Sequence, residues 1–158
     1  MNRLLRSTVL VTIVIAAAAV ALAAGTDPVV GTWKLNVTKS KFNSSQAPKS
    51  ETRTYVVAGK DIKASSKVVD ASGKPTGASW IVNYDGKDRP ETGNPDADTL
   101  AVKRVNASTT EFTQKRAGKV VITGTRTISA DGKVMTITTK GTDAHGQAID
   151  TVQVFEKQ

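Results

Sequence analysis

Glycine-centred turns divide most of this 158-residue chain into segments of strand length. The turn glycines are Gly59, Gly73, Gly86, Gly118, Gly132 and Gly146. Apolar and polar residues alternate between the turns, as in residues 32–35 and 151–154, and period two is typical of a half-buried strand. The pattern predicts strands at 31–37, 52–58, 61–69, 78–84, 98–104, 109–115, 118–129, 132–140 and 148–156.

Consecutive strands joined by short turns form a meander, and a twisted meander of this length closes into a barrel without free edges. We therefore expect an all-β domain, a single up-and-down antiparallel β-barrel of about 8–9 strands, in preference to a two-sheet sandwich. Residues 38–51 are polar and contain Pro48, which favours one short helical turn around Phe42 or a loop over one end. The long hairpin 85–98 either caps a pocket or extends into solvent.

The N-terminus has the features of a secretory signal peptide. Two arginines precede an uncharged apolar run, and Ala21-Leu22-Ala23 fits the small-x-small cleavage pattern, so we place the cut after Ala23. The run has 17 residues, at the short limit for a membrane span, so we favour cleavage over an uncleaved anchor. We expect a signal peptide at 1–23, a barrel at 24–158, and a periplasmic or extracellular protein.

Composition argues against several classes of function. The chain has no cysteine and one histidine, which excludes thiolate metal sites and paired catalytic histidines. It has no nucleophile-elbow serine, phosphate-binding glycine loop or dinucleotide fingerprint, so we expect no enzyme and no cofactor. The net charge of +8 is spread over turn lysines and aromatic residues are few, so we expect no nucleic-acid partner. We expect a monomer with, at most, weak contacts to anionic envelope components.

Five carboxylates fall within the segment 85–98, and hard oxygen ligands on a glycine-containing loop could hold calcium. Their spacing does not match an EF-hand loop, and two basic residues lie among them. We therefore interpret the segment as a solvated hairpin loop and predict no metal site. The five are Asp85, Asp88, Glu91, Asp96 and Asp98.

Three short motifs resemble those of a known group of proteins. Gly31-Thr32-Trp33-Lys34-Leu35 resembles the Gly-x-Trp opening strand of the calycins, the group of lipocalins and intracellular fatty-acid-binding proteins. Tyr84-Asp85-Gly86-Lys87 and Val154-Phe155-Glu156-Lys157 resemble the aromatic-Asp-Gly-Lys hairpin and the last strand of the fatty-acid-binding proteins. The resemblance implies a closed antiparallel barrel, often with an internal pocket for an apolar ligand. It also implies a structural role for Gly31 and for Trp33, which would pack across the barrel base.

The chain departs from the fatty-acid-binding proteins in two respects. Those proteins have a helix pair between their first two strands, whereas only 14 residues separate Val37 from Thr52 here. They bind the ligand carboxylate through an Arg-x-Tyr pair on the last strand, and Gln153 and Phe155 occupy those places here. The resemblance therefore does not extend to that carboxylate site, and a bacterial secreted lipocalin-like domain is the closer description.

Two arginines, Arg53 and Arg126, lie inside alternating strands. A guanidinium that faced the interior would bind an anionic ligand group bidentately, and one at the rim would extend to water. Because charges are rarely buried unpaired, the rim position is favoured. The candidate ligand-binding residues are Arg53, Tyr55, Trp80, Val82, Tyr84, Phe112, Ile122 and Arg126.

Two functions follow from these observations. The first is a non-catalytic secreted barrel that binds a small, partly apolar or amphipathic ligand. The alternative is an envelope structural or interaction protein with a filled barrel and no small ligand, which the many strand threonines favour. The volume of the barrel interior distinguishes them, since a ligand site needs a cavity of roughly 300 Å³ or more.

Overall fold

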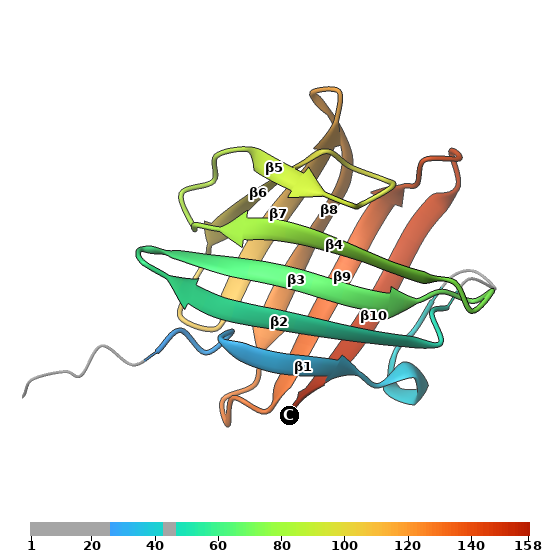
Figure 1. Cartoon of the computed structure of the whole chain (residues 1–158). Helices are drawn as coiled ribbons and strands as arrows, with labels where there is room; N and C mark the ends of the chain where they lie inside the picture. Colours follow the sequence, from blue (N-terminus) through green and yellow to red (C-terminus); the bar gives the residue numbers. More distant parts are fainter. Residues whose placement is uncertain (1–25, 43–46) are drawn as a thin grey trace, which may run out of the picture.

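The computed structural model describes residues 26–42 and 47–158, and the predicted signal peptide at 1–23 lies outside them. The described chain forms ten strands and one short 3-10 helix (Figure 1). The strands are β1 (Gly31–Leu35), β2 (Ser50–Ala58), β3 (Asp61–Val69), β4 (Pro75–Val82), β5 (Arg89–Thr92), β6 (Thr99–Arg104), β7 (Thr109–Arg116), β8 (Lys119–Ile128), β9 (Val134–Thr142) and β10 (Ala148–Lys157), and the helix η1 is Val37–Lys39. No helix in this part of the chain is long and apolar enough to cross a membrane.

The strands form one closed antiparallel barrel. Each strand pairs with its neighbours along the chain, and β1 pairs with β10 as well as with β2. Trp33 of β1 thus lies opposite Lys157 on one side and Arg53 on the other. In Figure 1, β1 to β4 lie in front of β7 to β10. The predicted all-β, up-and-down barrel is confirmed, and its closure pairs strands that would otherwise be exposed edges.

The barrel has ten strands rather than the expected 8–9. The additional strand is β5, which lies within the segment 85–98 that we interpreted as a hairpin loop. It is short and polar and contains Pro90, a composition that argues against a strand. Only two residue pairs join it to β4 and two to β6. The segment therefore forms part of the barrel wall.

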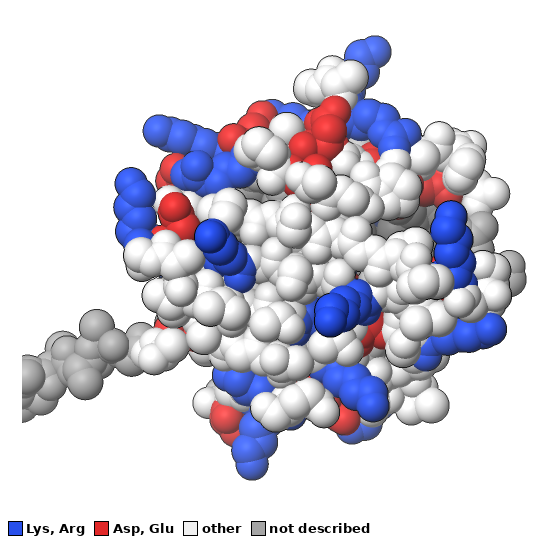
Figure 2. All heavy atoms as spheres, in the orientation of Figure 1, with Lys and Arg blue, Asp and Glu red and all other residues white. Residues whose placement is uncertain are grey.

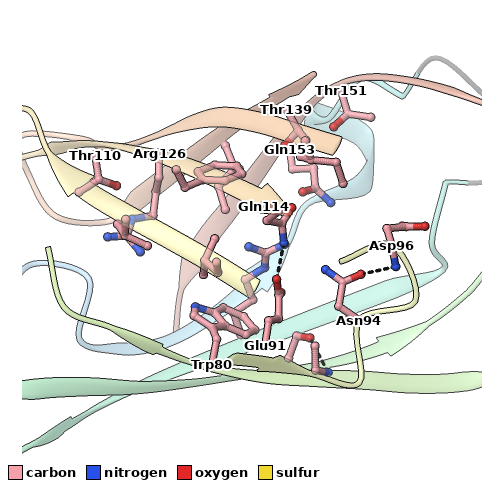
Figure 3. A pocket seen from close by; sticks show the side chains of 18 of the residues that line it. Trp80, Glu91, Asn94, Asp96, Thr110, Gln114, Arg126, Thr139, Thr151 and Gln153 are labelled. Carbon is pink, nitrogen blue, oxygen red and sulfur yellow. Dashed lines mark hydrogen bonds between the residues drawn. The ribbon is translucent and has the colours of Figure 1, made fainter. Parts of the chain in front are cut away.

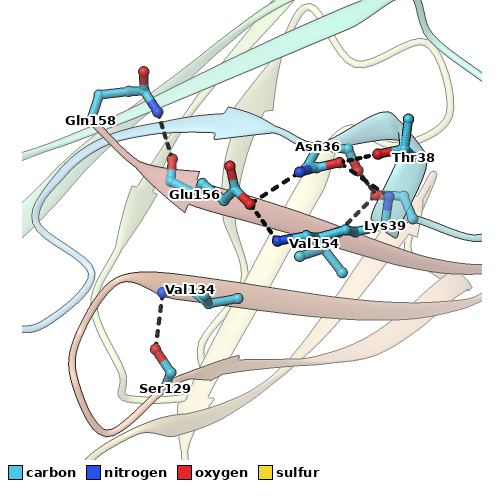
Figure 4. Close-up of polar contacts among 9 residues, drawn as sticks. Asn36, Thr38, Lys39, Ser129, Val134, Val154, Glu156 and Gln158 are labelled. Atoms are coloured by element: carbon cyan, nitrogen blue, oxygen red, sulfur yellow. Dashed lines mark hydrogen bonds and ion pairs between the residues drawn. The ribbon is translucent and has the colours of Figure 1, made fainter.

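The polar connection between β1 and β2 contains a short helical turn, η1, which precedes Phe42 instead of surrounding it (Figure 4). Asn36 caps this turn, since its Oδ1 accepts a hydrogen bond from the Lys39 amide at 3.1 Å. Glu156 of β10 accepts hydrogen bonds from Asn36 Nδ2 at 3.0 Å and Lys39 Nζ at 2.9 Å, which ties the turn to the last strand. Phe42 is partly buried against the core.

An apolar core fills one end of the barrel, which we call the closed end. Its largest fully buried side chains are Trp33, Tyr55, Phe155, Met135, Val29 and Val82. Val29 belongs to the segment before β1, and its carbonyl accepts a hydrogen bond from Trp33 Nε1 at 2.7 Å. The indole therefore fixes the N-terminal segment against the barrel while contributing the largest buried surface.

Charged side chains are scattered over the face that presents β1 to β4. In Figure 2, Lys and Arg side chains stand apart from one another on this face, and acidic groups lie among those at its margin. Nucleic-acid binding requires basic groups clustered in a patch or stripe. The described residues on this face form no such patch.

Candidate functional site

A cavity of about 310 Å³ lies inside the barrel, next to the closed end (Figure 3). Its apolar wall consists of Tyr55, Ala78, Trp80, Leu100, Val102, Phe112, Ile122, Ile137 and Ile149. Its polar lining consists of Arg53, Ser66, Glu91, Asn94, Asp96, Thr110, Gln114, Arg126, Thr139, Thr151 and Gln153. An apolar wall combined with polar groups that point inward is typical of a small-molecule site, and in this cavity the polar residues outnumber the apolar ones.

Six of the eight candidate residues line this cavity, namely Arg53, Tyr55, Trp80, Phe112, Ile122 and Arg126. Val82 and Tyr84 do not, which corrects their assignment to the pocket. They border a separate depression beside the turn between β2 and β3. Along β4 the inward side chains run from Ala78 and Trp80, which line the cavity, to Val82 in the core. Alternation identifies the inner face of a strand but not the depth of each residue.

Both arginines face the interior, so the expectation that they reach water at the rim is wrong. Arg126 is 7% exposed, and the Arg53 side chain is 20% exposed. The Arg53 guanidinium lies 4.9 Å from the ring centroid of Phe155, and that of Arg126 lies 5.5 Å from the ring centroid of Tyr55. These cation–π contacts offset part of the cost of burying a charge.

Arg53 has a carboxylate partner inside the barrel. Its Nε donates to Oε1 of Glu51 at 2.6 Å, and Glu51 is only 5% exposed. The second oxygen of Glu51 accepts a hydrogen bond from Gln153 Nε2 at 3.3 Å. Burial lowers the pKa of Arg53, but the Glu51 carboxylate and Tyr55 outweigh burial and raise it. The charges of Arg53 and Glu51 therefore compensate each other locally.

Arg126 has no such partner: no ion pair joins it to a carboxylate in the described part of the chain. Its Nη2 donates to the Tyr84 hydroxyl at 3.3 Å, and its Nε is buried without a hydrogen-bond partner among the described residues. Thr110, 3% exposed, lies opposite Arg126 in the register of β7 and β8, and its Oγ1 is also buried without a partner. Because buried polar groups are nearly always hydrogen-bonded, these two atoms are suited to donate to an acceptor in the cavity.

Tyr84 connects Arg126 to the segment before β1. Its hydroxyl accepts a hydrogen bond from Arg126 and donates one to Asp27. Asp27 pairs with Arg104, whose guanidinium lies 3.7 Å from the Tyr84 ring centroid. Burial raises the pKa of Tyr84 to about 12. Burial also raises the pKa of Asp27, but the Val29 amide, Tyr84 and Arg104 together bring it below its usual value.

The segment 85–98 contributes a cavity residue that the sequence analysis missed, Glu91. Its Oε2 accepts a hydrogen bond from Gln114 Nε2 at 2.7 Å. Burial raises the pKa of Glu91, against the opposing effect of hydrogen bonds from Gln114 and Asn94. Glu91 faces inward because it is paired with Trp80 of β4, and directly paired residues share one face of a sheet. Since β5 has no strand pattern, the sequence held no signal for this position.

The other acidic residues of this segment are dispersed. Asp85 pairs with Arg89 at 2.7 Å, and Asp88 pairs with Lys115 at 2.6 Å. Asp96 accepts a hydrogen bond at 2.8 Å from a backbone amide of the turn between β9 and β10. No group of three or more His, Cys, Asp or Glu residues in the described chain is arranged to hold a metal ion.

No protein-family model and no curated protein matches this chain. Among solved structures, the crystal structure of Rv2717c from M. tuberculosis is 13% identical, with a TM-score of 0.51 over 83% of this chain and 93% of that one. EF1p2_mFAP2b bound to DFHBI is 10% identical, with a TM-score of 0.51 over 83% and 94%. The zebrafish ileal bile acid-binding protein complexed with cholic acid is 12% identical, with a TM-score of 0.48 over 83% and 99%. The fold is calycin-like. At these identities the likeness shows the fold alone.

Proposed function

We propose that this protein binds a small amphipathic molecule inside the barrel, with an anionic or hydrogen-bond acceptor group at Arg126. The observation that carries the proposal is the buried Nε of Arg126, which lacks a partner and lines a cavity of about 310 Å³. The complex of EF1p2_mFAP2b with DFHBI supports it, because that barrel of the same fold was solved with a small molecule bound.

The two polar atoms without partners suit the acceptor end of such a ligand. An oxygen that accepts from Arg126 Nε and Thr110 Oγ1 would satisfy both at once. A hydrogen bond to a charged group contributes about 1.5–3 kcal/mol, which corresponds to roughly ten- to a hundredfold in affinity. Arg53 does not compete for this role, because its charge is compensated by Glu51. The rings of Trp80 and Phe112 provide the apolar wall.

The first test asks whether a ligand occupies the interior, with the fluorescent anion 1-anilinonaphthalene-8-sulfonate as the probe. Thr139 lines the cavity, whereas its neighbour Thr138 is on the opposite face of β9. Titration of the probe should show one saturable site in the wild type and in T138F, and at least about tenfold weaker binding in T139F, which fills the cavity. No saturable binding to the wild type, or equal binding to T138F and T139F, would contradict an internal site.

The second test addresses the acceptor end of the ligand. Arg126→Met removes the charge at a similar side-chain length, and Lys119→Gln removes an exposed positive charge from the same strand. R126M should weaken binding of the sulfonate probe by at least about tenfold, and K119Q should leave it unchanged. Equal affinity in R126M and the wild type would show that Arg126 does not contact the acceptor group.

We also propose that the barrel acts in the periplasm or outside the cell, as a monomer, after cleavage following Ala23. The N-terminal pattern described above supports this proposal. N-terminal sequencing of the protein from its host should begin at Ala24. A chain that retained Met1 would contradict cleavage. The alternative of a filled barrel loses its support, because the described interior contains a cavity.

A further inference from the structure

The charged groups that line the cavity are unequally distributed along it. In Figure 3, Arg126 and Thr110 lie at one end, with Glu91 well separated from them. Arg53 is compensated by Glu51, so it adds little net charge between them. Neither Arg126 nor Glu91 has an ion-pair partner in the described part of the chain. The cavity therefore presents a cation at one end and a separate acidic group farther along.

Strand β7 provides the spacing between these two groups. Thr110, opposite Arg126, and Gln114, which is hydrogen-bonded to Glu91, are both inward residues of β7 and lie four positions apart. At about 3.3 Å per residue, roughly 13 Å of strand separates them. Phe112 occupies the inward position between them. An apolar surface thus lies between two polar ends.

We infer that the ligand has two polar ends: an anionic group bound at Arg126 and an ammonium or other hydrogen-bond donor bound at Glu91, joined by an apolar chain along Phe112 and Trp80. This inference rests on the proposed function and specifies its ligand. It assigns a binding role to Glu91 and sets the order of groups along the ligand as acid, apolar chain and donor.

The surroundings of Glu91 favour a donor over a second acid. A carboxylate accepts about four hydrogen bonds, and the amides of Gln114 and Asn94 account for two of them, so Glu91 can still accept from a ligand donor. The nearby cation, Arg53, has its Nε committed to Glu51. Asp96 lines the same end and adds a second negative group. Burial also makes ionisation of Glu91 unfavourable in the empty cavity, and an ammonium bound beside the carboxylate would offset that cost.

Two acids of equal chain length test this inference, octanoate and 8-aminooctanoate, each measured at pH 7.5 by displacement of the anilinonaphthalene sulfonate probe. The wild type should bind 8-aminooctanoate about tenfold more tightly than octanoate. Glu91→Gln should abolish that preference, so that the two acids bind the variant with similar affinity. The matched control is Glu111→Gln, because Glu111 is exposed on strand β7 and E111Q should retain the preference.

The possible outcomes separate this inference from the proposed function. If octanoate binds the wild type as tightly as 8-aminooctanoate does, the barrel holds a ligand with one polar end and the role of Glu91 is overturned. If E91Q retains the preference, another group recognises the ammonium and the assignment is again overturned. If the probe binds but neither acid displaces it, the two-ended ligand is refuted and the proposed function stands. If the probe itself does not bind, the proposed function fails as well.

Discussion

Replacing each cavity arginine by methionine should change the stability of the unliganded barrel in opposite directions. Arg53 and Arg126 both face the interior, and both lie near aromatic rings. They differ in their partners, since Arg53 is paired with Glu51 and Arg126 has no carboxylate partner among the described residues. A residue retained for stability and a residue retained for binding should therefore respond differently to the same substitution.

For Arg126, the free-energy contributions to folding favour methionine over arginine in the unliganded barrel. The buried Nε without a partner costs about 1–3 kcal/mol, and removal of the guanidinium from water adds to that cost. The variant loses the 3.3 Å hydrogen bond to Tyr84 and the cation–π contacts with Tyr55 and Tyr84, about 0.5–1 kcal/mol each at such distances. We expect R126M to raise the free energy of unfolding by about 1–2 kcal/mol.

For Arg53, the same change leaves a carboxylate uncompensated. Glu51 is 5% exposed and, within the described part of the chain, its carboxylate would keep only the 3.3 Å side-chain hydrogen bond from Gln153. Removing one partner of a buried ion pair typically costs about 3–5 kcal/mol, so R53M should lower the free energy of unfolding by roughly that amount.

Urea denaturation followed by tryptophan fluorescence measures both changes on one scale, provided that the slope of free energy against urea is the same for all three proteins. The expected order of stability is R126M, then wild type, then R53M. If R126M is destabilised by more than about 1 kcal/mol, Arg126 has a structural role, and its Nε does not indicate a ligand.

Three further predictions follow. Gly124→Ala should lower the free energy of unfolding by about 1–3 kcal/mol in a urea titration, because the added Cβ would overlap the Thr138 carbonyl oxygen and the Phe112 ring; an unchanged midpoint would contradict this close approach. Trp33→Phe should cost about 1–3 kcal/mol in the same assay, since it leaves the Val29 carbonyl without its buried donor; a loss below about 0.5 kcal/mol would be inconsistent with that role. The folded pKa of Glu91 is raised, so its contribution to stability is fully present below pH 4.5 and declines as pH rises through the folded value. The stability of wild type relative to E91Q should therefore fall with rising pH above 4.5, and a difference that grew with pH would refute the raised pKa.

The barrel could be predicted because turn chemistry and alternation agree at most hairpins. In the turn between β8 and β9, Asp131 Oδ1 accepts from the Lys133 amide at 3.0 Å, and Gly132 has a φ of +69°. The Asp-Gly pair is visible in the sequence, as is the alternation on both sides. The strand β5 could not be predicted, because its four residues include Pro90 and depend on β4 and β6 for their extended conformation.

The site was predictable only in part. Alternation predicts which face of a strand a side chain occupies, whereas its depth in the barrel and the compensation of its charge depend on contacts with residues far away in the sequence. For Arg53 a signal was present, since Glu51 lies two residues earlier on the same face of β2 and so can pair with it. For Arg126 no local signal existed, because Tyr84 comes from a distant part of the chain. The rule that charges avoid the interior gave the wrong answer for both arginines, since it takes no account of partners inside the barrel.

The closed end also influences the charge of the cavity. Asp27 belongs to the segment that packs beneath the barrel through Val29, and it receives a hydrogen bond from Tyr84, whose hydroxyl in turn accepts from Arg126. Asp27 forms its ion pair with Arg104 and is linked to Arg126 through the Tyr84 hydroxyl. The arrangement fixes the position of the Arg126 guanidinium without neutralising it. A fixed, uncompensated cation in a partly apolar cavity is preorganised for an anionic group, because little rearrangement is needed when the ligand binds.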